Sequence, residues 1–388
     1  MNKLLSIAAL PLALAVPAMA QEEPVPEAPA AVTPNSVIAD AAAEEWRPIA
    51  AENLLVMDLA PDANGNARRI VIQLMQAPFS QRWVENIRTL ARAEYWDGSS
   101  VNRVQDNYVV QWGQPDEGFG GTVKPVPEGL NVVPEECYEV QLDFEPPCEN
   151  PAPRDHDAAY QAAITAIGVA EAAAAEAMTM SEAGSEAILG QPIVQHPKGN
   201  GAISMLATAS SEAPEGWHER DPYAEWVEFH EGWPLAAREI GKDEFDAPLW
   251  SFWPTHCYGM VGVGRNLSPD TGDGSQLYTV IGHAPRHLDR NIALVGRVID
   301  GMEHLTSLPR GTGPLGFYES EEELVPIRSA RIASDMNEPP TYEYLNTGSA
   351  SFERYVAVRA NRQDDFYNIP AGGVDICNVP VPIRRTAE

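Results

Sequence analysis

Residues 95–113 constrain the fold and the chemistry of this chain more than any other segment. They read Tyr-Trp-Asp-Gly-Ser-Ser-Val-Asn-Arg-Val-Gln-Asp-Asn-Tyr-Val-Val-Gln-Trp-Gly. We expect one strand from about Val101 to Trp112, which would place Arg103 and Gln111 on one face, since they are an even number of residues apart. No metal-binding cluster or acid–base pair stands beside them. Rotation about an X–Pro bond needs no more than this, because a donor that prefers the twisted amide lowers a barrier of roughly 20 kcal/mol without covalent chemistry.

Two apolar runs upstream indicate an antiparallel sheet. Residues 54–59 and 69–74 flank the sequence Asp62-Ala63-Asn64-Gly65-Asn66, and Asn-Gly between such runs is a hairpin signal. A helix is expected to begin at Ser80, because apolar residues then recur at helical spacing. These are Trp83, Val84, Ile87, Leu90 and Ala91.

The segment around Arg103 resembles the cyclophilin family of peptidyl-prolyl isomerases, and further blocks extend the resemblance in the same order along the chain. They are Ala77-Pro78 with Val84, Asn86 and Leu90; Gly274-Ser275-Gln276-Leu277-Tyr278; Leu288-Asp289-Arg290-Asn291; and Val295-Gly296-Arg297-Val298 with Gly301-Met302. The resemblance implies a mainly β fold, an eight-stranded antiparallel barrel with two capping helices. The expected organisation is a signal peptide (1–20), a disordered linker (21–45), the barrel (46–115 and 256–335), a partly helical insertion (116–255) and a C-terminal extension packed on the barrel (336–388).

The resemblance also implies roles for individual residues. Arg103 would be the catalytic donor to the prolyl nitrogen, and Gln111 would hold the substrate backbone. The substrate-binding positions that it implies are Tyr108, Val109, Gln276, Tyr278, His287 and Leu288. It implies neither a cofactor nor a metal, and its partners would be proline-containing segments of folding proteins.

Several groove positions depart from the family pattern. Val261-Gly262 replaces an Ala-Asn pair, His287 replaces a Trp, and Ile292 replaces a His. Two functions therefore stay open: an isomerase, or a non-catalytic peptide-binding or chaperone module. From residue type alone, Arg103 has a structural alternative, which is an ion pair with a neighbour such as Asp106.

The N-terminus has the pattern of a secretory signal peptide. Lys3 precedes an apolar run from Leu4 to Val16, and Ala18-Met19-Ala20 forms an A-x-A cleavage site. We therefore expect an exported, periplasmic protein with no membrane anchor. With 56 acidic and 26 basic residues, the formal charge of −30 argues against a nucleic-acid partner, which requires a basic surface.

The four cysteines are compatible with disulfides in an oxidising compartment. We favour Cys137 with Cys148, which bracket a Pro-rich loop, and this leaves Cys257 with Cys377; buried free thiols are the alternative.

Three segments outside the family blocks also carry predictions. Ala- and Glu-rich residues from Asp155 to about Met180 predict a helix. The aromatic-rich residues 217–253 are more typical of a core or packed interface than of a ligand cage. Residues 354–359 are expected to form a strand.

Overall fold

The computed structural model describes residues 32–114, 124–141, 217–243, 245–362, 366–369 and 371–386. The predicted signal peptide, Cys148 and the helix expected over 155–180 lie outside these residues. Within the described ranges, no helix combines the length and apolarity needed to cross a bilayer.

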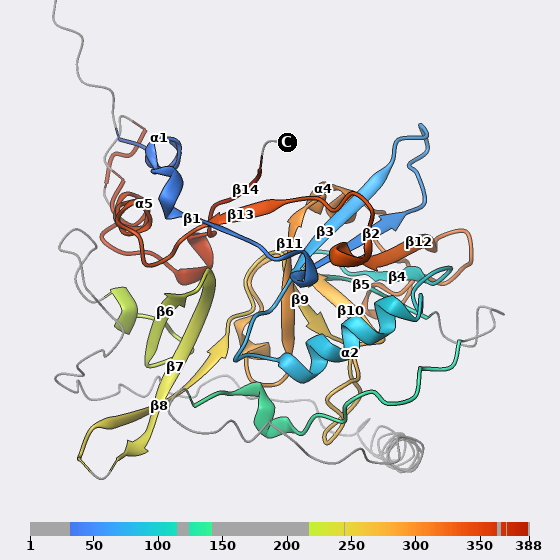
Figure 1. Cartoon of the computed structure of the whole chain (residues 1–388), viewed down its shortest axis with the longest axis horizontal. Helices are drawn as coiled ribbons and strands as arrows, with labels where there is room; N and C mark the ends of the chain where they lie inside the picture. Colours follow the sequence, from blue (N-terminus) through green and yellow to red (C-terminus); the bar gives the residue numbers. More distant parts are fainter. Residues whose placement is uncertain are drawn as a thin grey trace, which may run out of the picture.

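Eight antiparallel strands close into a barrel, as predicted (Figure 1). Their order around the barrel is β10-β5-β4-β12-β2-β3-β11-β9, and pairing of β9 with β10 closes it. The strands are β2 (Leu54–Leu59), β3 (Arg68–Leu74), β4 (Ser100–Val104), β5 (Val109–Gly113), β9 (Met260–Val263), β10 (Leu277–Val280), β11 (Leu294–Asp300) and β12 (Val325–Ile332). The hairpin predicted around Asn64-Gly65 is confirmed, since β2 pairs with β3.

Two α-helices lie against the barrel. Helix α2 (Gln81–Arg92) packs on β12 and β11, and α4 (Met302–Thr306) packs on β3. The face of α2 predicted from helical spacing is the buried one, and its Trp83 indole donates to the Gly272 carbonyl at 3.0 Å. Short 3-10 turns connect other elements: η1 (Ala43–Glu45), η2 (Ala51–Asn53), η4 (Glu135–Tyr138), η5 (Trp217–Glu219), η6 (Arg286–Leu288), η7 (Pro314–Gly316), η8 (Ala333–Asp335) and η9 (Ile376–Asn378).

A second hydrophobic core covers the outside of β2 and β3. Alternate side chains of a strand point to opposite faces, so Leu55 and Met57 fill the barrel while Leu54 and Val56 face outward. The outward residues pack with Tyr344 and other side chains of the C-terminal extension. Strands buried on both faces read as continuous apolar runs, which explains the sequence of residues 54–57.

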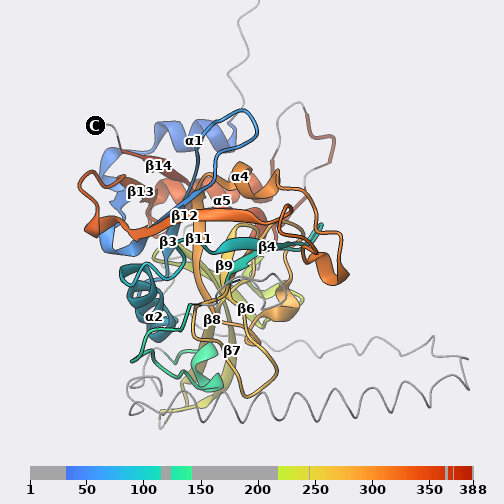
Figure 2. The same ribbon diagram turned by 90° about the vertical axis from the view of Figure 1, so that its right-hand side faces the viewer.

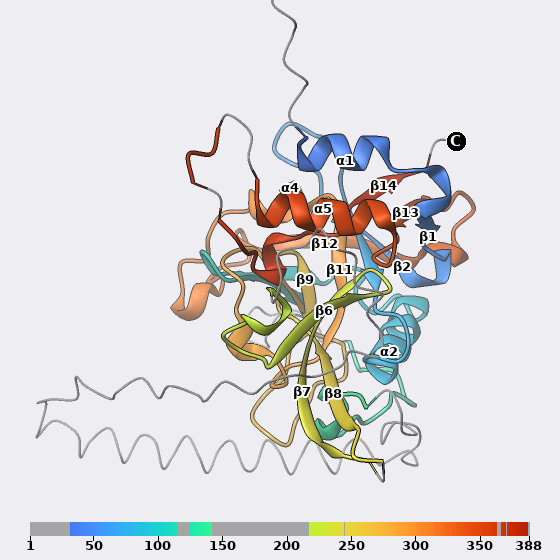
Figure 3. The same ribbon diagram turned by 90° about the vertical axis from the view of Figure 1, so that its left-hand side faces the viewer.

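The second core is built from two three-stranded sheets and two helices (Figures 1 and 2). One sheet has the order β1-β13-β14 and the other β6-β7-β8. The strands are β1 (Trp46–Pro48), β13 (Tyr342–Leu345), β14 (Ile383–Arg385), β6 (Trp226–His230), β7 (Trp233–Lys242) and β8 (Pro248–Pro254). Helices α1 (Pro34–Asp40) and α5 (Ala350–Ala360) lie side by side (Figure 3). Most of the aromatic residues in 217–253 contribute to the two cores, in line with the interface interpretation; Phe245 and Tyr223 are exposed.

Two predictions for the ends of the chain were wrong. Residues 354–359 are not a strand but part of α5, because Phe352, Tyr355, Val356 and Ala360 recur at helical spacing and are all buried. Ser349 caps this helix by accepting from the Phe352 amide at 3.2 Å.

The linker predicted over 21–45 is also too long. Thr33 and Ser36 form a capping box around Pro34, which starts α1, and Val37 is buried in the second core. Strand β1 then pairs with β13 rather than joining the barrel, so the barrel begins at Leu54 instead of residue 46.

The disulfide expected between Cys257 and Cys377 is present, with the Cα atoms 5.0 Å apart. It joins the loop after β8 to η9 in the C-terminal extension. Cys137 is also disulfide-bonded. Because Cys148 lies outside the described residues, the pairing of Cys137 with Cys148 stays a prediction.

Candidate active site

Arg103 and Gln111 lie opposite each other on two paired strands. The single strand predicted over 101–112 is wrong: β4 ends at Val104, the chain turns, and β5 begins at Val109. Asn107 sits in the turn with φ 51°, a left-handed conformation that Asn tolerates better than most residues. The antiparallel register pairs Arg103 with Gln111, so cross-strand pairing, rather than spacing along one strand, brings them together.

Three oxygen acceptors hold the Arg103 guanidinium. Its Nη1 donates to Gln111 Oε1 at 3.2 Å, its Nη2 donates to Gln105 Oε1, and its Nε donates to the Leu315 carbonyl at 2.8 Å. A guanidinium has five N–H groups, so two remain for a ligand. Gln105 and Leu315 were not expected at the site.

Two aromatic rings flank the same guanidinium. The Arg103 Cζ atom lies 5.8 Å from the centroid of the Tyr108 ring and 5.1 Å from that of Phe317. Phe317 comes from a loop that runs along β4, where it forms a bridge with Arg103. Sequence reasoning missed Phe317, since no spacing links residue 317 to residue 103.

No carboxylate pairs with Arg103 among the described residues. Asp106, the expected structural partner, binds Arg310 instead, with 2.9 Å between Arg310 Nε and Asp106 Oδ1. Burial lowers the pKa of Arg103, which nonetheless stays far above neutrality for any arginine. The site therefore contains a half-buried cation whose charge is not compensated by an acidic neighbour.

A small apolar cluster lies on β5, on β10 and on the segments beside them, separate from the barrel interior. It contains Tyr108, Val109, Tyr278, Val280 and Ile292. Tyr278 is the register partner of Gln111, so this cluster and the guanidinium share one surface of the β4–β5–β10 sheet. Three of the predicted substrate-binding residues, Tyr108, Val109 and Tyr278, thus come together beside Arg103.

A buried chain of polar side chains begins at Tyr278. The Tyr278 hydroxyl lies 2.9 Å from His256 Nε2, and His256 Nδ1 lies 2.9 Å from Asp289 Oδ1. The other Asp289 oxygen accepts from Arg286 Nε at 2.5 Å, and Arg286 Nη1 donates to Asp221 at 2.8 Å. Sequence reasoning missed this chain, because its members are spread over residues 221–289.

Two comparisons relate the chain to known proteins. A family model described as "Cyclophilin type peptidyl-prolyl cis-trans isomerase/CLD" matches residues 220–332, and so reaches from just before β6 to the end of β12. The chain carries a cyclophilin-type domain. Its fold is similar to the crystal structure of a cyclophilin from Hirschia baltica, with a TM-score of 0.53, 17% identity, and coverage of 91% of this chain and 97% of that chain. None of the curated protein sequences matches the chain.

The family match leaves out the strands that carry Arg103 and Gln111. The matched residues 220–332 include β9 to β12, whereas β4 and β5 lie more than a hundred residues before the start of the match. A functional role for Arg103 and Gln111 is therefore argued from their geometry and not from the family match.

The remaining predicted site residues lie apart from the guanidinium. Gln276 donates through Nε2 to the Gln114 carbonyl at 2.9 Å and covers Gly113, so it links the start of β10 to the end of β5. His287 in η6 is exposed, and Leu288 beside it is half-buried. Their roles in binding substrate stay predictions.

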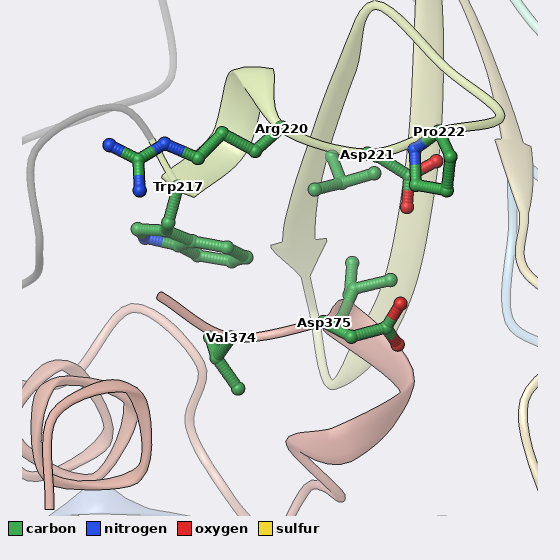
Figure 4. A pocket seen from close by; sticks show the side chains of 8 residues that line it. Trp217, Arg220, Asp221, Pro222, Val374 and Asp375 are labelled. Carbon is green, nitrogen blue, oxygen red and sulfur yellow. The ribbon is translucent and has the colours of Figure 1, made fainter. Parts of the chain in front are cut away.

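Two cavities lie elsewhere in the described part of the chain, and Arg103 lines neither of them. The larger, of about 500 Å³, is lined by Arg47 of β1, Glu228 of β6, Tyr344 of β13 and neighbouring residues. The other, of about 230 Å³, has Trp217 and Asp221 on one side and Val374 and Asp375 on the other (Figure 4). No group of His, Cys, Asp and Glu suited to a metal ion occurs within the described ranges.

We expect Asp289→Asn to destabilise the protein by about 3–5 kcal/mol at pH near 7, because it removes one partner from a buried charged network. Burial alone would raise the pKa of Asp289, but the hydrogen bonds from His256 and Arg286, together with the charge of Arg286, outweigh burial and lower that pKa below 3.8. The carboxylate therefore stabilises the folded state fully when the pH is well above 3.8, its ordinary pKa, and this stabilisation is lost as the pH falls through the lower folded-state pKa. Urea unfolding from about pH 7 to about pH 3 measures the difference in the free energy of unfolding between wild type and variant. This difference should become smaller only at the acid end of the range.

Asp58→Asn is the matched control for this prediction. Asp58 also pairs with an arginine, Arg69, at 2.8 Å, but the pair is exposed. Its loss should cost less than about 1 kcal/mol. A similar cost for both variants would contradict the importance of the buried network.

Proposed function

We propose that this cyclophilin-type protein is a peptidyl-prolyl cis–trans isomerase that acts on X–Pro bonds of exported proteins and assists their folding. The observation that carries the proposal is the uncompensated Arg103 guanidinium beside the apolar cluster of Tyr108, Val109 and Tyr278. A structural arginine is normally paired with a carboxylate when half-buried, whereas a catalytic donor needs N–H groups that remain for the substrate.

The proposed mechanism uses electrostatic stabilisation of the twisted amide. In a planar X–Pro bond the nitrogen lone pair is delocalised, and it becomes a hydrogen-bond acceptor only as the bond rotates. The Arg103 guanidinium, which Gln111, Gln105 and the Leu315 carbonyl hold in place, donates to that lone pair in the transition state. Because this interaction is absent in the ground state, it raises the rate rather than the affinity. The apolar cluster would take the proline ring.

The proposal is tested by the cis-to-trans exchange rate of Ala-Pro and other X–Pro peptides, measured by NMR with the mature wild-type protein. We expect exchange to accelerate in proportion to protein concentration. A folded wild type that binds these peptides but leaves their exchange rate unchanged would replace the isomerase proposal with the peptide-binding or chaperone module. Gly262, His287 and Ile292 favour that second function, because each departs from the residue usual in the groove.

We also propose that the protein is exported to the periplasm. The apolar run from Leu4 to Val16 followed by Ala18-Met19-Ala20 supports this, and the disulfide between Cys257 and Cys377 is compatible with an oxidising compartment. Fractionation of cells that express the full chain, with the N-terminus of the mature protein determined by mass spectrometry, tests it. We expect cleavage near Gln21; an intact N-terminus in the cytoplasmic fraction would contradict export.

A further inference from the structure

The Tyr278 ring occupies a place that only a glycine neighbour permits. A Cβ atom added at Gly262 on β9 would lie 2.3 Å from the Tyr278 Cζ and hydroxyl oxygen. The ring therefore extends from β10 directly over the backbone of β9, its register partner. Tyr278 is almost fully buried although it belongs to the apolar cluster beside Arg103.

His256 fixes the far end of this ring. The Tyr278 hydroxyl and His256 Nε2 are 2.9 Å apart, and the two rings are nearly parallel at 11°. Because a carboxylate only accepts, His256 Nδ1 donates to Asp289, and in the neutral ring Nε2 accepts from the Tyr278 hydroxyl. Burial raises the pKa of Tyr278 well above its ordinary value, so the hydroxyl keeps its proton.

The groups behind His256 hold it rigidly. Asp289 Oδ1 accepts from both the backbone amide and Nδ1 of His256, each at 2.9 Å. Arg286 bridges Asp289 and Asp221, and the side chains of all four residues are at most 4% exposed.

A network of this kind is hard to explain by stability alone. Removing charged groups from water costs several kcal/mol per ion, and apolar residues of the same volume are often as stable. What such a network does provide is a single geometry for the groups at its end. Here that end is the Tyr278 hydroxyl, beside the proposed prolyl site.

We propose that His256 is a positioning residue that sets the shape of the prolyl groove by anchoring the Tyr278 hydroxyl over Gly262. The inference rests on the proposed function for the identity of the ligand. It assigns substrate affinity to the Tyr278–His256 pair and leaves the rate of rotation to Arg103. The pair would thus determine which X–Pro segments fit.

A double-mutant cycle tests the inference. Tyr278→Phe removes only the hydroxyl, and His256→Gln replaces the ring that anchors it. The peptide Ala-Ala-Pro-Phe is titrated into each variant to obtain Kd by NMR, and its exchange rate at saturation gives kcat. We expect each single variant to weaken binding at least about fivefold, while kcat stays within about twofold. The double variant should bind no more weakly than either single variant, because both changes remove the same contact.

Tyr355→Phe is the matched control. It removes the hydroxyl of another buried tyrosine, which donates to the Pro380 carbonyl at 2.8 Å in the second core. Its Kd should equal that of wild type. Unchanged Kd in Tyr278→Phe, or additive losses in the double variant, would overturn the inference.

A measurement without ligand separates this inference from the proposed function. In wild type, the Tyr278 hydroxyl proton should exchange slowly with water and show a nuclear Overhauser effect to the His256 ring; His256→Gln should abolish that signal. A wild type that binds the peptide without accelerating its cis–trans exchange overturns the isomerase proposal. The Kd values of the double-mutant cycle then still decide the role of His256. A wild type that binds no proline peptide, or a Tyr278 hydroxyl that exchanges as fast as an exposed one, overturns the role of His256 in the groove.

Discussion

Arg103→Ala should lower kcat/KM for an Ala-Pro peptide by about two to three orders of magnitude, the effect typical of removing one transition-state donor. Peptide affinity should change little, because the proline ring would contact the apolar cluster rather than the guanidinium. The rate is measured by NMR exchange and the affinity by titration on the same samples.

Two further arginine variants sharpen this prediction. Arg103→Lys keeps the positive charge but loses the planar fork that Gln111, Gln105 and the Leu315 carbonyl hold, so we expect at least a tenfold loss. Arg69→Ala removes an exposed barrel arginine paired with Asp58 and should retain wild-type activity. If Arg103→Ala retains wild-type kcat/KM, the guanidinium is not the catalyst.

Replacing both Cys257 and Cys377 by Ala should lower the free energy of unfolding by about 4 kcal/mol. The two cysteines are 120 residues apart in sequence, and a cross-link over so long a loop strongly restricts the unfolded chain. Equilibrium unfolding in urea measures the loss.

The single variants provide the control for the disulfide. Cys257→Ala and Cys377→Ala each break the same cross-link, so each should lose about as much stability as the double variant rather than half of it. A double variant within about 1 kcal/mol of wild type would show that packing in the second core, rather than the cross-link, holds the extension in place.

The sequence was most informative where local chemistry decides the structure. Asn64-Gly65 between two apolar runs predicted the β2–β3 hairpin, and helical spacing predicted α2. The turn at residues 105–108 was missed because Asp106-Asn107 is a weaker hairpin signal than Asn-Gly. The resemblance to a known family still identified Arg103 and Gln111 as neighbours, although the reason given for it, a shared face of one strand, was wrong.

The parts of the site that the sequence did not predict depend on long-range packing. Phe317 reaches Arg103 from a loop more than two hundred residues away, and His256 meets Asp289 because the segments before β9 and before β11 come together in the folded chain. In α5, Tyr355 and Val356 favour a strand by intrinsic preference, but burial against the second core selects the helix. Such outcomes are decided by tertiary contacts, which a single sequence does not display.

The strand order of the barrel has a consequence for the time course of folding. Strand β2 pairs with β12 and β3 pairs with β11, so the first two barrel strands to leave the ribosome have partners in the second half of the chain. The barrel cannot close until residues up to Ile332 have been synthesised. Such non-local pairing slows folding, and a chain that stays unfolded during synthesis is also one that a translocation channel can still thread.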